Sequence, residues 1–185
     1  MFDVGATAKS WVREGNQWQG PNVAPEQAAS GFPFATNDRL LIDERSGGVY
    51  FWATFIPKNL GGGSFYLMGL RDSTGELFDG ASSYRLSVPP DTPAGDFWSV
   101  IAYSMETKGF IEDAETVGLS SLDAEKLQAH DDGSIDVYFG PEPPAGLRSN
   151  WIPTGQAFFL IFRFYGPEKP LFEKTWQLPD VERVN

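Results

Sequence analysis

The chain has 185 residues, no cysteine and a formal net charge of −11, and 41% of its residues are hydrophobic and 15% aromatic. This composition is typical of one globular domain, and it excludes disulfides and thiol catalysis. The acidic balance argues against nucleic-acid binding, which needs a basic patch. The longest apolar runs are too short to span a membrane.

Residues 1–48 are predicted to form an N-terminal extension that packs on the rest of the chain. The apolar spacing within Phe2–Glu14 predicts one short helix that ends at Gly15. The prolines and glycines of 20–33 interrupt any regular element after it. The first residues lack the basic and apolar regions of a signal peptide, so we expect a soluble, cytoplasmic protein by default. A periplasmic location is expected if the chain belongs to an exported parent protein.

Residues 49–185 are predicted to form a β-sandwich or jelly-roll domain. Runs of aromatic and β-branched residues, closed by proline or glycine, recur along this part of the sequence and are typical of strands. We expect strands at 49–56, 65–71, 83–88, 97–104, 135–139 and 157–165. The fold class is therefore all-β with one or two short helices.

One segment departs from the strand pattern. Residues 121–130 read as a short helix, with Ser120 or Ser121 as its N-cap and acidic residues in the first turn. The segment belongs to an acidic region, 106–136, which contains nine acidic residues and two lysines. Such a region is either a solvated surface excursion or an acidic face for a cation or a basic partner.

Four sequence blocks resemble a bacterial family known as domain of unknown function 1214. The blocks are Tyr84-Arg-Leu-x-Val-Pro-Pro with Asp96-Phe-Trp-Ser-Val, Asp132-Gly-Ser-Ile-Asp-Val-Tyr-Phe-Gly-Pro, Asn150-Trp-Ile-Pro, and Arg163-Phe-Tyr-Gly-Pro with Trp176 and Pro179. The resemblance covers roughly 49–183 and implies a jelly-roll-type fold. It also implies a companion domain, number 1254, that usually precedes this one on a longer polypeptide. It implies no reaction, substrate or cofactor.

The sole histidine, His130, lies beside Asp131 and Asp132. It is a candidate general base or metal ligand, or simply a residue at the C-terminus of the expected helix. A zinc site without another histidine or any cysteine would need three carboxylates, and the segment Asp131–Asp136 lacks the spacing of a calcium loop. No nucleophile, phosphate-binding or dinucleotide motif is present. We therefore predict no catalytic residue, no metal and no cofactor.

Arg163 is the strongest candidate for ligand binding. It interrupts the apolar stretch 158–165, and a buried guanidinium is costly unless it is paired. Arg163 therefore either faces solvent, or pairs with an acid such as Asp96, or binds an anion or carboxylate inside the jelly roll. The aromatic residues Trp98, Tyr103 and Trp151 are candidate walls of the same binding site.

These observations favour a non-enzymatic β-sandwich that binds a companion domain or assembles with copies of itself. One alternative is a hydrolase or lyase that uses carboxylates and Arg163 in a jelly-roll pocket. Another is a carbohydrate-binding module, for which exposed tryptophans or tyrosines would form a flat platform. A small-molecule or glycan ligand is compatible with either alternative.

Overall fold

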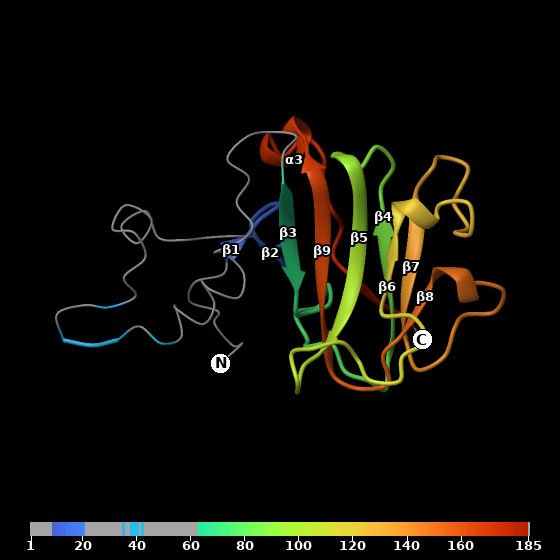
Figure 1. Cartoon of the computed structure of the whole chain (residues 1–185), viewed down its shortest axis with the longest axis horizontal. Helices are drawn as coiled ribbons and strands as arrows, with labels where there is room; N and C mark the ends of the chain where they lie inside the picture. Colours follow the sequence, from blue (N-terminus) through green and yellow to red (C-terminus); the bar gives the residue numbers. More distant parts are fainter. Residues whose placement is uncertain (1–8, 21–34, 36–37, 41, 43–62, 185) are drawn as a thin grey trace.

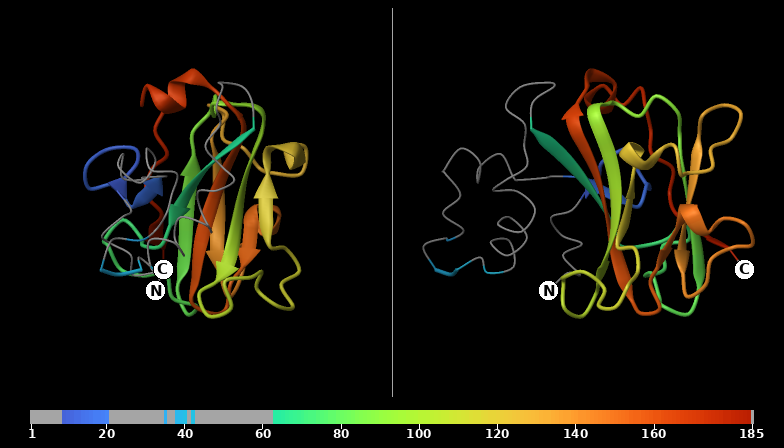
Figure 2. Two further views of the ribbon diagram at one scale, coloured as in Figure 1. Left: turned by 60° about the vertical axis from the view of Figure 1, so that its left-hand side comes forward. Right: turned by 45° about the vertical axis from the view of Figure 1, so that its right-hand side comes forward.

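The computed structural model describes residues 9–20, 35, 38–40, 42 and 63–184. Its strands form two sheets packed face to face (Figures 1 and 2). The large sheet contains, in spatial order, β1 (Lys9–Ser10), β2 (Trp18–Gly20), β3 (Ser64–Gly69), β9 (Phe158–Pro167), β5 (Ala94–Ser104) and β6 (Gly118–Ser120). The small sheet contains β10 (Glu182–Val184), β4 (Ser83–Val88), β7 (Ile135–Gly140) and β8 (Trp151–Pro153). Only β7 and β8 pair in parallel among the described strands. The predicted all-β sandwich is confirmed.

The core lies between the sheets, and strand alternation decides which side chains enter it. On β4, Tyr84, Leu86 and Val88 are buried while the residues between them are half-exposed. Strand β9 differs, because its run from Phe158 to Phe162 is buried on both faces. The strands predicted at 65–71, 83–88, 97–104, 135–139 and 157–165 are confirmed as β3, β4, β5, β7 and β9. The short strands β1, β2, β6, β8 and β10 were not predicted.

The helix predicted over residues 121–130 is wrong in its extent. The chain forms only a 3₁₀ turn, η1 (Ser121–Asp123), capped by the Ser120 side chain as expected. The side chain of Asn150 binds both the backbone N–H and the C=O of Gln128, so these groups are not available to a helix. The other short helices are η2 (Arg148–Asn150) and α3 (Lys169–Phe172).

The described part of the N-terminal extension belongs to the large sheet. Strands β1 and β2 form an antiparallel hairpin, and β2 pairs with β3. The helix predicted over 2–14 is therefore wrong where the structure describes it, since Lys9–Ser10 are strand and 11–15 are bend and turn. The proposed domain boundary at residue 48 and the strand expected at 49–56 lie outside the described residues.

Candidate binding sites on the two sheet faces

The outer face of the large sheet is apolar and aromatic along its three central strands. Strand register places the outward side chains in cross-strand rows: Ser64, Tyr165 and Phe97; Tyr66, Arg163 and Ser99; Met68, Ile161 and Ile101; then Phe159 and Tyr103. The last two rows, with Leu70 and Met105, belong to an apolar cluster that is separate from the sandwich core. Arg163 is the one charged residue in these rows.

The Arg163 guanidinium lies between two tyrosine rings on this face. Its central carbon is 5.1 Å from the ring centre of Tyr66 and 5.8 Å from that of Tyr103. One terminal nitrogen donates a hydrogen bond to the Tyr103 hydroxyl. The Nε atom is buried and has no hydrogen-bond partner.

Arg163 has no carboxylate within ion-pair distance among the described residues. The sequence suggested Asp96 as an ion-pair partner of Arg163, but the Asp96 carboxylate lies beside Gly166. Tyr66 does not supply the countercharge, because burial raises the pKa of its hydroxyl even though the charge of Arg163 acts in the opposite direction. Among the described residues, the contacts of this cation are the rings of Tyr66 and Tyr103 and the Tyr103 hydroxyl.

The structure separates the four side chains that the sequence grouped as one candidate ligand site. Arg163 and Tyr103 meet on the outer face of the large sheet. Trp98 points into the core, where it stacks on Phe162 with ring centres 5.4 Å apart. Trp151 belongs to the small sheet, and its indole N–H donates to the Gly140 carbonyl.

Trp98 also borders a pocket of about 240 Å³ at one end of the sandwich. The pocket lies between the end of β4, the start of β5, η1 and the turn before β7. It is lined by Val88, Pro89, Pro90, Asp91, Thr92, Ala94, Trp98, Ser121, Gly133 and Ile135. Its volume is below the roughly 300–1,000 Å³ of pockets that enclose drug-sized ligands.

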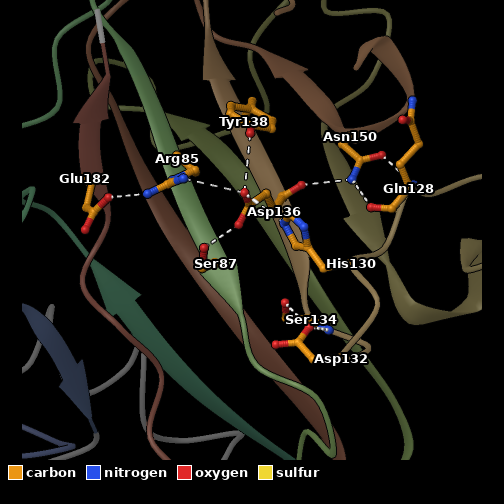
Figure 3. Close-up of polar contacts among 10 residues, drawn as sticks. All are labelled: Arg85, Ser87, Gln128, His130, Asp132, Ser134, Asp136, Tyr138, Asn150 and Glu182. Carbon is orange, nitrogen blue, oxygen red and sulfur yellow. Dashed lines mark hydrogen bonds and ion pairs between the residues drawn. The ribbon is translucent and has the colours of Figure 1, made fainter. Parts of the chain in front are cut away.

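The outer face of the small sheet carries a polar cluster centred on Asp136 (Figure 3). The Asp136 carboxylate accepts hydrogen bonds from Ser87 and, at 3.4 Å, from the Tyr138 hydroxyl. Arg85 lies 3.7 Å from it and also pairs with Glu182 at 2.6 Å. The charges on this face are therefore compensated within the cluster, in contrast to Arg163.

His130 belongs to the same cluster, because its Nε2 lies 3.2 Å from Asp136 Oδ2. Two features place it there: Asn150 fixes the backbone at Gln128, and a turn closes from His130 to Ser134. The His130 side chain is 59% exposed, whereas that of Asp136 is 10% exposed. The sequence did not predict this pairing, although it contains the turn signal Asp132-Gly133 between the two residues.

Asp132, two residues after His130, has a structural role in this turn. Asp132 accepts hydrogen bonds from the Ser134 N–H and hydroxyl, and these bonds lower the pKa of its carboxyl group. Across the described residues, no group of three or more histidines or acids is arranged to hold a metal ion. No helix in the described ranges is long and apolar enough to cross a membrane.

The sequence pattern of DUF1214, a family of proteins of unknown function, matches residues 63–169. The chain belongs to this family. The resemblance predicted from the four sequence blocks is thus confirmed, whereas the companion domain stays a prediction. No curated protein matches the chain.

Two solved structures are similar to this DUF1214 chain. A protein from Vibrio parahaemolyticus has a TM-score of 0.61 and 21% identity over 89% of this chain and 47% of its own. An uncharacterised protein from Burkholderia cenocepacia has a TM-score of 0.45 and 22% identity over 89% of this chain and 44% of its own. The Vibrio protein shares the fold, and the chain spans less than half the length of either protein.

Proposed function

We propose that this DUF1214 domain is a non-enzymatic binding module that docks a companion domain on the outer face of its large sheet. The observation that carries the proposal is the apolar and aromatic outer face of β3, β9 and β5. An antiparallel sheet with one solvated face normally alternates apolar and polar residues, so this face has the composition of a covered surface.

The composition of the face supports docking of a polypeptide. Tyr66, Met68 and Ile101 are half-buried and surround Arg163. Aromatic residues, methionine and arginine are enriched where proteins bind one another. Phe159, Ile161 and Tyr103 on the same face are already 0–7% exposed within this chain, so a companion would dock on the half-exposed part of the face, at Tyr66, Met68 and Ile101.

The length of the Vibrio protein supports a companion domain as the occupant. This chain aligns with 47% of that protein, so the relative holds about as much polypeptide again beyond the shared sandwich. A second copy of this chain is the other occupant to test. It is less favoured, because two chains of net charge −11 repel each other.

A photo-crosslinking experiment tests the docking face. The photoreactive amino acid p-benzoylphenylalanine replaces Met68 on this face, or Leu122, which is 71% exposed and lies elsewhere. After irradiation in the native host, mass spectrometry identifies the crosslinked peptide. We expect the Met68 probe, and not the Leu122 probe, to capture a polypeptide related to the remaining half of the Vibrio protein. Capture of a second copy of this chain would refute the companion domain and indicate self-association. Equal capture at both positions would refute the docking face.

The second candidate function is a hydrolase or lyase, and the contact between His130 and Asp136 favours it. When Nε2–H donates to Asp136, the other ring nitrogen of His130 is left as a base. Hydrolysis of p-nitrophenyl acetate by the purified chain, compared with His130→Gln, tests this function. An unchanged rate in His130→Gln would reject it.

A carbohydrate-binding platform has less support. Trp11, Trp18, Trp98, Trp151 and Trp176 are each buried or half-buried, and none of them forms an exposed flat surface. Trp52 lies outside the described residues.

A further inference from the structure

We infer that the pocket beside Trp98 binds a small uncharged molecule of monosaccharide size, whose hydroxyl groups pair with Trp98, Ser121 and Asp91. The pocket has a volume of about 240 Å³ and lies at one end of the sandwich. The outward-facing rows of the large sheet contribute none of its lining residues, so the inference does not depend on the proposed function.

The indole N–H of Trp98 is a hydrogen-bond donor that the fold leaves unused. Trp18, Trp151 and Trp176 donate their indole N–H groups to backbone carbonyls, at 2.7, 3.1 and 3.1 Å. Trp98 is only 6% exposed, yet in the described part of the chain it makes hydrogen bonds through its backbone alone. Its indole nitrogen is not sealed from solvent, unlike that of Trp11. A buried tryptophan normally pairs this group, so an acceptor inside the pocket would complete the site.

Ser121 and Asp91 supply the other free polar groups of the pocket wall. Ser121 Oγ accepts the backbone N–H of Trp98 at 3.1 Å, and its own hydroxyl proton has no acceptor in the described ranges. The Asp91 carboxylate is exposed and has no hydrogen-bond or ion-pair partner among the described residues. Asp91 is also the one charged residue of the lining. The pocket therefore offers two donors and one carboxylate acceptor, without a positive charge.

This set of groups decides the charge of the ligand. An anion could accept hydrogen bonds from Trp98 and Ser121, but the Asp91 carboxylate would repel it. An ammonium group could pair with Asp91, but it would leave both donors unused, because it accepts no hydrogen bond. A hydroxyl group both donates and accepts, so a neutral molecule with several hydroxyl groups satisfies all three residues.

The rest of the lining sets the size and shape of the ligand. Its volume is smaller than that of pockets for drug-sized ligands, which suits one ring and not a chain of rings. The prolines of the wall are held in place, since the Thr92 hydroxyl donates to the Pro89 carbonyl and the Trp176 indole donates to the Pro90 carbonyl, both at 3.1 Å. A wall fixed in advance reduces the entropy lost on binding. The apolar side chains that would pack against the C–H groups of a ring are Val88, Pro89, Pro90, Ala94 and Ile135.

Nuclear magnetic resonance of the tryptophan indole N–H groups in the purified chain tests this site. D-glucose, D-galactose and D-mannose serve as the neutral probes. The control ligands have rings of similar size: D-glucuronate adds a negative charge, and cyclohexylammonium offers a positive charge without a hydroxyl group. The Trp98 resonance is assigned by its absence from the spectrum of Trp98→Phe. The Trp151 resonance is the internal control, because its N–H is already bound to the Gly140 carbonyl.

We expect at least one neutral sugar to shift the Trp98 resonance saturably and to leave that of Trp151 unchanged. The affinity for that sugar, measured by calorimetry, should fall about tenfold in Trp98→Phe, which keeps an aromatic ring but removes the N–H. It should also fall in Asp91→Ala and stay unchanged in Trp151→Phe. Circular dichroism verifies that the three variants are folded.

Three results would overturn the inference. The first is the absence of a shift at Trp98 with all three sugars. The second is tighter binding of glucuronate or cyclohexylammonium than of any neutral sugar, since the pocket would then select a charge. The third is an unchanged sugar affinity in Asp91→Ala, a substitution of an exposed residue that stays informative if Trp98→Phe does not fold.

Discussion

Replacing Lys174 with methionine is expected to stabilise the protein at pH 7. Lys174 follows α3, and its ammonium nitrogen is buried without a hydrogen-bond partner. The nitrogen lies 2.9 Å from the ring centre of Trp11. Burial lowers the pKa of Lys174 from 10.5 to about 8. The charged form therefore costs free energy in the folded state that a methionine would not.

The pKa shift fixes the sign of the pH dependence. Between pH 8 and 10.5 the unfolded chain holds the Lys174 proton more tightly than the folded chain, so wild-type stability rises with pH across this window. Below it both states are protonated and the full penalty applies. The difference between 10.5 and about 8 sets a ceiling of about 3 kcal/mol. Partial exposure and the cation–π attraction of Trp11 reduce the expected penalty to about 1–2 kcal/mol.

Urea unfolding of the wild type and Lys174→Met at pH 7 and pH 10.5 measures this penalty. Lys174→Met should be more stable by about 1–2 kcal/mol at pH 7, and the advantage should shrink at pH 10.5. Lys126→Met is the control, since the Lys126 side chain is 78% exposed. A variant that is less stable at pH 7, or an advantage independent of pH, would refute the reasoning. It would mean that the indole of Trp11 stabilises the ammonium group by more than burial costs.

Two further substitutions test a close backbone contact and a buried hydrogen-bond network. Gly80→Ala should lower the free energy of unfolding by about 1–3 kcal/mol, because a Cβ at this position would lie 2.2 Å from the Gln156 backbone. Thermal unfolding measures this, and an unchanged midpoint would contradict the close contact. Asn150→Ala should cost about 2–4 kcal/mol, because it removes the buried hydrogen bonds to the backbone of Gln128 and Asp136. Hydrogen exchange should then accelerate at the Gln128 amide, and continued protection of that amide would show that Asn150 does not hold the loop.

The sequence predicted strands wherever local signals agreed. The alternation of Tyr84, Leu86 and Val88 with polar residues set both the extent of β4 and its inward face. The run from Phe158 to Phe162 predicted a strand but not its faces, because every residue in it is apolar. Its outward half packs in a second cluster that pattern alone does not reveal.

The candidate sites were harder to predict because long-range contacts create them. Trp98 and Trp151 have similar aromatic signals, yet one enters the core and the other lies on the small sheet. The expected helix over 121–130 is limited by Asn150, which binds Gln128 from 22 residues away. Local helix signals contain no information about such a partner.

The two outer faces differ in how their charges are balanced within the described part of the chain. On the small sheet, Arg85 lies between Asp136 and Glu182, so each charge there has a partner without any other chain. On the large sheet, Arg163 is held between two tyrosines without a carboxylate in the described part of the chain. A half-buried cation without a carboxylate partner is a cost to the folded domain. Arg163→Met should accordingly stabilise the chain in urea unfolding, and a less stable variant would show that the contacts with Tyr66 and Tyr103 outweigh the cost of the buried charge.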